Sequence, residues 1–226
     1  MQVKLAISGA SGKTGFRIAE EALASGFKVR LLVRKSSLLP ETLETCEKYV
    51  LSLGDENSLD EAIKGCDALL IATGAKPSFD LTGPARVDAC GVQKQVESCK
   101  RVGVRRLVLV SSLCAGRLLH PLNLFGLILI WKRVGEEALE KSGLDWTVIR
   151  PGGLSETEDN LEEQGILFTG PNKQQDAYIP RRLVARCCIE AIKTPDSIGE
   201  IIEVTSDNSV PQIKMKEALR EIRLST

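Results

Sequence analysis

Short runs of aliphatic residues recur along the chain, and longer segments with apolar residues at helical spacing lie between them. The short runs predict strands at residues 3–7, 29–33, 48–53, 68–73, 106–111, 146–149 and 201–204. The longer segments predict helices at 16–25, 58–65, 86–102, 127–142, 181–193 and 212–223. Because strand and helix alternate with short connections, we predict an α/β fold with a parallel, doubly wound sheet of the Rossmann type.

One polar segment interrupts this alternation. Residues 153–175, after the sixth predicted strand, are rich in Glu, Asp, Asn, Gln and Gly. Loops at this edge of an α/β sheet commonly cover a ligand, so we interpret 153–180 as a lid; a solvated surface insertion is the alternative. No linker divides the chain, so we expect one domain over residues 1–226, with 195–226 completing the substrate region.

The charges of the chain balance. Thirty Lys and Arg residues against 30 Asp and Glu give a formal net charge of zero over 226 residues. Such a chain has no overall field to attract phosphate backbones or acidic lipids, which disfavours nucleic acid and membrane surfaces as partners. The longest apolar stretch, from Leu124 to Trp131, is far shorter than the roughly 20 residues of a membrane helix. We therefore expect a small-molecule substrate or acceptor and no integral membrane segment.

The first predicted strand begins at Val3, so we expect no signal or transit peptide. This favours a cytoplasmic protein, or a protein of the plastid stroma if the chain is a mature or plastid-encoded form. Seven cysteines without a CxxC pair argue against a disulfide framework and fit a reducing compartment. His120 is the only histidine, so a zinc site would lack its usual mixed ligands and we expect no metal.

The loop after the first predicted strand reads Gly-Ala-Ser-Gly-Lys-Thr-Gly and opens the first predicted helix. In this context Gly9 allows a tight turn, Gly12 lets the backbone approach a pyrophosphate, and Gly15 lets the helix pack against the strand. Free N–H groups and the helix dipole favour the anion. A Walker A loop is excluded, because its first glycine would have to lie at Ile7. The candidate phosphate-binding residues are Gly9, Ser11, Gly12, Lys13, Thr14 and Gly15.

The residue after the second predicted strand indicates which dinucleotide binds. NAD-binding proteins place an acidic residue here to hold the ribose 2′-hydroxyl. In this chain Val33 is followed by Arg34 and Lys35. A guanidinium binds a phosphate through two parallel hydrogen bonds, whereas a carboxylate would repel it. The cofactor predicted from this pattern is NADP(H), with Arg34 at the 2′-phosphate; an exposed basic strand end is the alternative.

Several further motifs accompany the glycine loop. They are Leu-Val-Arg34, Gly54-Asp55, Ala72-Thr73-Gly74-Ala75, Ser111-Ser112, Trp131-Lys132 and Arg150-Pro151-Gly152-Gly153. Together they resemble the atypical short-chain dehydrogenase/reductases of the NmrA-like, NAD(P)-binding family. The resemblance runs from the first strand to about Ala191, and plant and cyanobacterial members are the most similar.

The resemblance implies further cofactor contacts. Asp55 would lie beside the adenine, and Thr73 and Gly74 would line the adenosine ribose. Ser111 and Ser112 would lie near the nicotinamide ribose at the end of the fifth strand.

The resemblance also implies the residues at the reacting end. Lys132 would be the active-site lysine, and Pro151, Gly152 and Gly153 would lie behind the nicotinamide ring. Arg181 would lie near the substrate edge. The candidate catalytic residues are Ser112 and Lys132.

One position departs from the family pattern. Short-chain dehydrogenases carry a tyrosine four residues before the lysine, which relays a proton to a carbonyl. Here that position is Ile128, whose aliphatic side chain cannot donate a proton. The alcohol/ketone mechanism is therefore not supported. Tyr178, in the predicted lid, is a second tyrosine that could approach the site.

Two functions remain open from the sequence. The first is an NADPH-dependent reductase of a small conjugated acceptor such as a flavin, a quinone or a tetrapyrrole, which needs little acid from the protein. The second is a non-catalytic NADP(H)-binding redox sensor or scaffold that acts through a protein partner. Retained Lys132 and Ser112, with a segment long enough to cover a substrate, favour the reductase.

The apolar stretch from Leu124 to Trp131 has no polar face. Core packing is the default interpretation for such a segment on a helix. A dimer interface, an apolar substrate pocket or a peripheral membrane contact are the alternatives. The sequence does not determine the oligomeric state.

Overall fold

The computed structural model describes residues 2–75, 81–175 and 177–224. Strands and helices alternate through most of the chain. The strands are β1 Lys4–Ser8, β2 Lys28–Val33, β3 Glu47–Val50, β4 Ala68–Ile71, β5 Arg106–Val110, β6 Asp145–Pro151, β7 Gly153–Ser155, β8 Gly165–Thr169, β9 Tyr178–Pro180 and β10 Glu200–Asp207. The helices are α1 Gly15–Ala24, α2 Glu56–Ile63, α3 Val92–Val102, α4 Ile128–Glu140, α5 Arg181–Lys193 and α6 Met215–Leu224. A π-helical segment, Ala85–Gly91, leads into α3, and short 3-10 turns complete the described elements.

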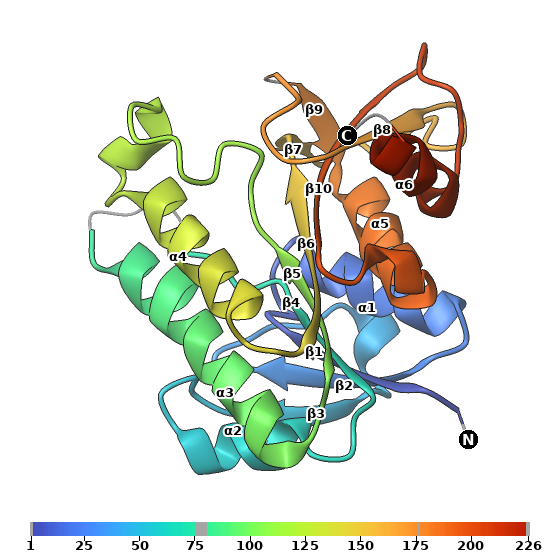
Figure 1. Ribbon diagram of the computed structural model, residues 1–226. Coiled ribbons are helices and arrows are strands. Elements are labelled where there is room, and N and C mark those ends of the chain that lie inside the picture. Colours follow the sequence, from blue (N-terminus) through green and yellow to red (C-terminus); the bar gives the residue numbers. More distant parts are fainter. Residues whose placement is uncertain (1, 76–80, 176, 225–226) are drawn as a thin grey trace.

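Eight strands form one twisted sheet in the order β3-β2-β1-β4-β5-β6-β10-β8. All neighbours are parallel except β8, which runs antiparallel to β10 at the edge. Helices α1, α5 and α6 cover one face, and α2, α3 and α4 cover the other (Figure 1). The order reverses between β1 and β4, and ligands of such sheets bind outside the carboxyl ends of the strands at this point. The predicted doubly wound Rossmann-type fold is confirmed.

The core lies on both faces of the sheet, because successive residues of a strand point to opposite sides. Leu5 and Ile7 of β1 are buried against α1 and α5, whereas Ala6 between them is buried against the opposite layer. Burial on both sides explains why the strands read as aliphatic runs rather than as an alternating pattern.

The polar region 153–175 contains more regular structure than we expected. Its residues 165–169 form β8 of the main sheet, and β7 pairs with β9 in a separate two-stranded sheet. In β8 only Gly165 and Phe168 are buried, which is why this edge strand lacks a continuous apolar run. The remaining residues of this region, 156–164 and 170–175, lie outside any strand or helix.

The long helix expected over 86–102 has two parts. Residues Ala85–Gly91 form a π-helix, in which the backbone hydrogen bonds span one residue more than in an α-helix, and α3 follows directly. π-Helical turns are frequent at functional sites because they redirect a side chain. Here the turn carries Asp88, which is buried.

Candidate functional site

The glycine loop follows β1, the strand at which the sheet order reverses. Gly9 has φ of +80°, and a Cβ there would lie 2.8 Å from the backbone of Ala72 and Thr73. A Cβ at Gly15 would lie 2.1 Å from the Gly9 carbonyl oxygen, and one at Gly12 3.2 Å from the same atom. The first and third glycines are therefore fixed by packing of the loop against β4 and of α1 against the loop.

The helix that begins at this loop has no side-chain cap at its N-terminus. Its N-cap residue, Thr14, instead accepts a hydrogen bond from Nη1 of Arg181 at 3.1 Å. Uncapped N–H groups of a helix N-terminus are donors for an anion, and the helix dipole adds a positive potential. The loop therefore fits a pyrophosphate by shape and by charge.

Three cations surround this loop. Lys13 forms an ion pair with Glu156, and Arg17 forms one with Glu158 while donating from Nη1 to the Lys13 carbonyl oxygen at 2.7 Å. Arg181 is the third. The resemblance implied a place near the substrate edge for Arg181, but its guanidinium lies on the glycine loop. Burial lowers its pKa, and Nε has no hydrogen-bond partner among the described residues.

Arg34 lies directly after β2 with an exposed side chain. Its backbone N–H donates to Oγ of Ser37 at 3.1 Å, and Ser11 of the glycine loop donates to the same oxygen at 3.0 Å. Ser11, Arg34 and Ser37 thus meet beside the glycine loop. Because the Ser37 oxygen accepts both of these hydrogen bonds, its own O–H group can donate to a further acceptor, such as a phosphate oxygen.

Asp55 has a structural role of its own. It is the N-cap of α2, where its carboxylate accepts from the backbone N–H of Ser58 at 3.2 Å and from the Ser58 hydroxyl at 2.6 Å. The hydrogen bond from the Ser58 hydroxyl lowers the pKa of Asp55. Capping alone accounts for an aspartate at this position, so a contact with adenine stays a prediction.

Lys132, on α4, is fixed by an ion pair with the π-helical turn. Its Nζ lies 2.8 Å from Oδ1 of Asp88, and Oδ2 of Asp88 accepts from the backbone N–H of Ala75 at 3.0 Å. Thr73, Asp88, Ser111 and Lys132 line a common small hollow. Gly74 lies at its rim, since a Cβ there would be 3.6 Å from Asp88 and 3.7 Å from Lys132.

The hydroxyl of Thr73 is buried, and its oxygen has no hydrogen-bond partner within the described residues. An unpartnered buried hydroxyl costs free energy unless a ligand or water completes it. Thr73 is therefore placed to bond a group entering between the glycine loop and Lys132.

The two serines after β5 differ in their hydrogen bonding. The hydroxyl of Ser111 donates to Oε1 of Glu136, which lies one helical turn beyond Lys132 on α4. Glu136 also accepts hydrogen bonds from Nε and Nη2 of Arg150. Ser111 can therefore only accept a hydrogen bond from a ligand. Ser112 is half-buried, and in the described part of the chain its hydroxyl has no partner.

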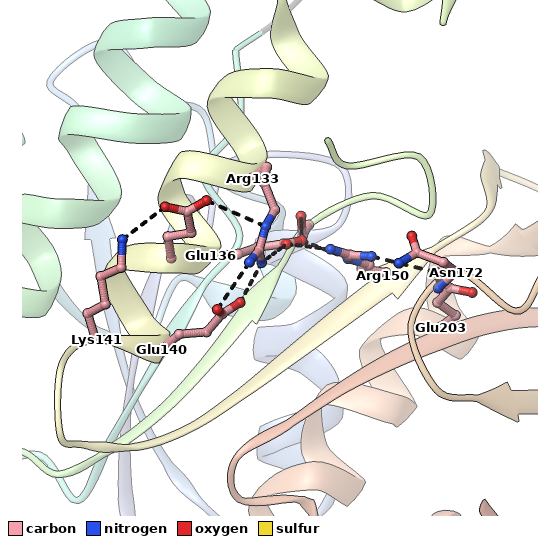
Figure 2. Close-up of polar contacts among 9 residues, drawn as sticks. Arg133, Glu136, Glu140, Lys141, Arg150, Asn172 and Glu203 are labelled. Atoms are coloured by element: carbon pink, nitrogen blue, oxygen red, sulfur yellow. Dashed lines mark hydrogen bonds and ion pairs between the residues drawn. The ribbon is translucent and has the colours of Figure 1, made fainter. Parts of the chain in front are cut away.

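A buried ionic network runs from Glu136 on α4 to β6 and then to the neighbouring strand β10 (Figure 2). Arg150 on β6 binds Glu136 at 2.7 and 2.9 Å and lies 3.7 Å from Glu203 on β10. Glu203 accepts the backbone N–H groups of residues 172–174, the turn after β8, at 2.6–3.0 Å. All three side chains are at most 3% exposed. The network ties the turn after β8 to Ser111.

The segment after β6 packs closely against residues 177 and 178. A Cβ at Gly152 would lie 2.3 Å from the Ala177 carbonyl oxygen, and one at Gly153 2.6 Å from the ring of Tyr178. Only glycine allows this approach. The Tyr178 side chain is exposed and lies over Gly153, so the ring borders the place where the resemblance puts the nicotinamide.

The apolar stretch from Leu124 to Trp131 is not uniformly buried. Leu129 is buried, but Leu124, Phe125 and Leu127 are exposed. Core packing therefore explains only part of this segment. No helix in the described ranges is long and apolar enough to cross a membrane. None of the seven cysteines, all within the described residues, forms a disulfide, and Cys114, near the two serines, is buried.

Sequence reasoning missed the side chains that organise the reacting end. The sequence predicted no functional role for Asp88, Glu136 or Glu203, and Arg150 was recognised only as part of the Arg-Pro-Gly-Gly motif. In a sequence, charged residues such as these are usually taken to be solvent-exposed. The one usable signal was an acidic residue in the helical segment before Val92, at a point where its neighbours are apolar.

Comparison with known proteins adds a family model described as NAD(P)H-binding, which matches residues 9–195. An uncharacterised chloroplastic protein of Arabidopsis thaliana is 31% identical over 238 residues, covering 97% of this chain and 82% of that protein. Sanguinarine reductase of Eschscholzia californica is 30% identical over 244 residues, covering 88% of each. Protein TIC 62 of Pisum sativum is 30% identical over 241 residues, and the match spans 96% of this chain but 45% of that protein.

Solved structures share the fold at lower identity. The oxidoreductase YlbE from Lactococcus lactis superposes with a TM-score of 0.81 at 21% identity, covering 98% of this chain and 97% of the other. A short-chain dehydrogenase/reductase from Veillonella parvula in complex with NADP gives a TM-score of 0.74 at 16% identity, covering 94% and 100%. These likenesses extend over nearly the whole described sheet and its helices.

Proposed function

Because the chain belongs to the NAD(P)H-binding family, we propose that it is an NADPH-dependent reductase that transfers hydride to a small conjugated acceptor. The observation that carries this proposal is the gathering of Thr73, Ser111 and Lys132 around one hollow beside an uncapped, glycine-rich helix N-terminus. The reductase named among the relatives supports the same class of reaction.

NADPH is the preferred cofactor in this proposal. The backbone N–H of Arg34 donates to the Ser37 hydroxyl, which Ser11 also contacts, and the exposed Arg34 side chain starts from this position. In the sequence no carboxylate directly follows β2 to bind a free 2′-hydroxyl. Charged and hydroxyl donors together suit a phosphate. Ser37 is thus a further contact for the 2′-phosphate, beyond those expected from the sequence.

The residues that would hold the dinucleotide follow from the same geometry. The loop amides around Gly12 and the Arg181 guanidinium suit the pyrophosphate, and the unpartnered Thr73 hydroxyl suits a ribose. Asp55 and Gly74 would line the adenosine half. Pro151, Gly152 and Gly153 would lie behind the nicotinamide, with Tyr178 at its border.

A bound reduced nicotinamide supplies the hydride, so the protein has to orient the acceptor and provide a proton. Ser111 cannot provide it, since Glu136 takes its hydrogen bond. The Ser112 hydroxyl has no partner among the described residues, and Lys132 is fixed by Asp88 with donors left for a ribose or an acceptor oxygen. We assign the proton to Ser112, to Lys132 or to water, and the absence of a tyrosine at Ile128 restricts the reaction to acceptors that need little acid.

The finer assignments form part of the proposal. The chain acts as one domain over residues 1–226, of the atypical short-chain dehydrogenase/reductase, NmrA-like subtype, with 153–180 as the lid. Two of the similar proteins are named as chloroplastic, which favours the plastid stroma over the cytoplasm for this chain. The alternative function is a non-catalytic NADP(H)-binding sensor, which the aliphatic Ile128 favours.

A titration with NADPH and NADH, followed by nicotinamide fluorescence, tests the cofactor assignment. We expect Arg34→Ala to weaken NADPH binding about tenfold or more, the range for a lost hydrogen bond to a charged group, and to leave NADH within twofold. Arg105→Ala is the matched control, because it removes an exposed arginine at the amino end of β5. Equal loss of both cofactors in Arg34→Ala would contradict the assignment.

Turnover tests the reductase itself. Flavin, quinone, biliverdin and sanguinarine are added to the NADPH complex while the absorbance of the reduced nicotinamide is followed. Oxidation of NADPH by one of these acceptors, slowed in Ser112→Ala or Lys132→Ala, supports the proposal. Tight binding without oxidation by any of them would favour the sensor.

A further inference from the structure

The acidic segment after β7 lies across the glycine loop. We call residues 156–164 the acidic strap; its carboxylates are Glu156, Glu158, Asp159, Glu162 and Glu163. Glu156 and Glu158 pair with Lys13 and Arg17 at the start of α1. Glu162 pairs with Arg186 at 2.6 Å on α5. These ion pairs hold the acidic strap on the protein together with packing of Leu161 against the core and hydrogen bonds from Gln212 and Ser206.

Glu156 forms an ion pair with Lys13 and lies within electrostatic range of Arg181 and Arg17. Its hydrogen bond from Lys13 lowers its pKa, and the positive charges of Lys13, Arg181 and Arg17 add to this effect. Each of these cations is connected to the glycine loop, because Lys13 belongs to it, Arg17 binds the Lys13 carbonyl oxygen and Arg181 binds Thr14. A carboxylate of the chain therefore occupies a cation cluster that is built around the phosphate-binding loop.

The cluster retains capacity for another anion. The helix N-terminus is uncapped, and Nε of Arg181 is buried with no partner among the described residues. Glu156 accepts its hydrogen bond from Lys13, so among the described residues it leaves these donors available. A pyrophosphate carries two charges and more acceptor oxygens, so it matches the same donors better.

We propose that Glu156 is a competing anion, which occupies the loop cations in the free protein and is displaced by the pyrophosphate of the dinucleotide. This inference rests on the proposed cofactor binding and adds its regulation. Displacement breaks the Lys13–Glu156 ion pair and frees the first part of the acidic strap. The strap then reports whether the site is filled, which is the ligand-dependent surface change that a redox sensor requires.

The expected effect on affinity is modest, because both partners of the Lys13–Glu156 pair are more than half exposed. Removing the competing charge by Glu156→Gln should tighten NADPH binding about two- to fivefold, the range of one exposed ion pair. The gain should shrink as salt is added, since salt screens exposed charges. Most residues near a ligand weaken binding when altered, so a gain is diagnostic.

Two controls isolate the effect. Glu162→Gln removes the same charge from the same strap, but its partner Arg186 lies on α5 away from the loop. Adenosine 2′-monophosphate carries the 2′-phosphate without the pyrophosphate. We expect NADPH to bind Glu156→Gln more tightly than wild type or Glu162→Gln, and adenosine 2′-monophosphate to bind all three alike.

Hydrogen exchange of the strap amides gives a second measurement on the wild-type protein. Saturation with NADPH should speed exchange in the first part of the strap, around Glu156, whereas adenosine 2′-monophosphate should not. Slower exchange with NADPH would mean that the strap closes over the ligand, and would overturn the inference.

The outcomes also separate the inference from the function it rests on. If wild-type protein binds NADPH and the two glutamine variants bind it equally, or Glu156→Gln binds it more weakly, the competing-anion role is wrong while cofactor binding stands. If wild-type protein binds neither NADPH nor NADH, both are wrong.

Discussion

The two halves of the sheet use charge in opposite ways. In the half formed by β1–β4, the Lys13–Glu156 and Lys4–Glu47 pairs each include an exposed glutamate. In the half formed by β5, β6 and β10, Glu136, Arg150 and Glu203 are almost wholly buried (Figure 2). Exposed pairs can exchange partners at little cost, whereas breaking a buried pair leaves an uncompensated charge. The first half is therefore suited to taking up and releasing an anion, and the second to holding reacting groups in one position.

Removal of Glu136 should have the largest effect. Glu136→Ala leaves Arg150 buried beside only Glu203 and frees Ser111, so we expect a loss of about 3–5 kcal/mol in the free energy of unfolding. Glu137→Ala is the matched control on the next position, because its pair with Lys141 is exposed and should contribute about 0.5 kcal/mol or less. Urea unfolding measures both. Similar losses in the two variants would remove the contrast between the halves.

The substitution Gly15→Ala should have the next largest effect on stability. It tests the β1–β4 half, where the backbone of the glycine loop is expected to bind the cofactor. The Cβ of Gly15→Ala would lie 2.1 Å from the Gly9 carbonyl oxygen, so the loop or α1 has to move. We expect about 1–3 kcal/mol of lost stability, typical of overpacking, together with at least tenfold weaker NADPH binding.

Gly170→Ala is the control for this substitution, because its Cβ meets nothing nearer than 3.8 Å. It should leave urea unfolding and NADPH titration near wild type. Wild-type binding by Gly15→Ala would show that the loop geometry does not determine cofactor affinity.

The contrast between the halves also explains what the sequence could predict. The glycine loop was predictable because its geometry depends on backbone that only glycine permits, and three glycines at fixed spacing are visible in one short segment. Helix α5 was predicted with its observed bounds, since Pro180 precedes it and apolar residues recur at helical spacing up to Lys193.

The buried network was not predictable in the same way. Glu136, Arg150 and Glu203 lie on α4, β6 and β10, and their pairing depends on the order of strands in the sheet. A glutamate on a helix reads as a solvated residue until the neighbouring arginine is known. The π-helical turn that carries Asp88 was likewise read as ordinary helix, because the sequence does not reveal the extra residue in the turn.

Acidification should give the smallest effect and tests the exposed half again. The hydrogen bond from Arg30 lowers the pKa of Glu47 in the folded protein. The unfolded chain therefore binds this proton at higher pH, so the contribution of Glu47 is present above its unfolded pKa and is lost as pH falls through the folded value. Since Glu47 is 41% exposed, we expect only a few tenths of a kcal/mol between about pH 7 and about pH 4.

Urea unfolding of wild type and Glu47→Gln at both pH values measures this difference. The variant should lose part of the pH dependence, whereas Glu44→Gln, an exposed glutamate without an ion pair among the described residues, should keep it. A loss as large as that of Glu136→Ala would mean that exposed charges in the β1–β4 half are held as firmly as the buried network. Glu156 could not then be released by a ligand at low cost, and the division of labour between the halves would be wrong.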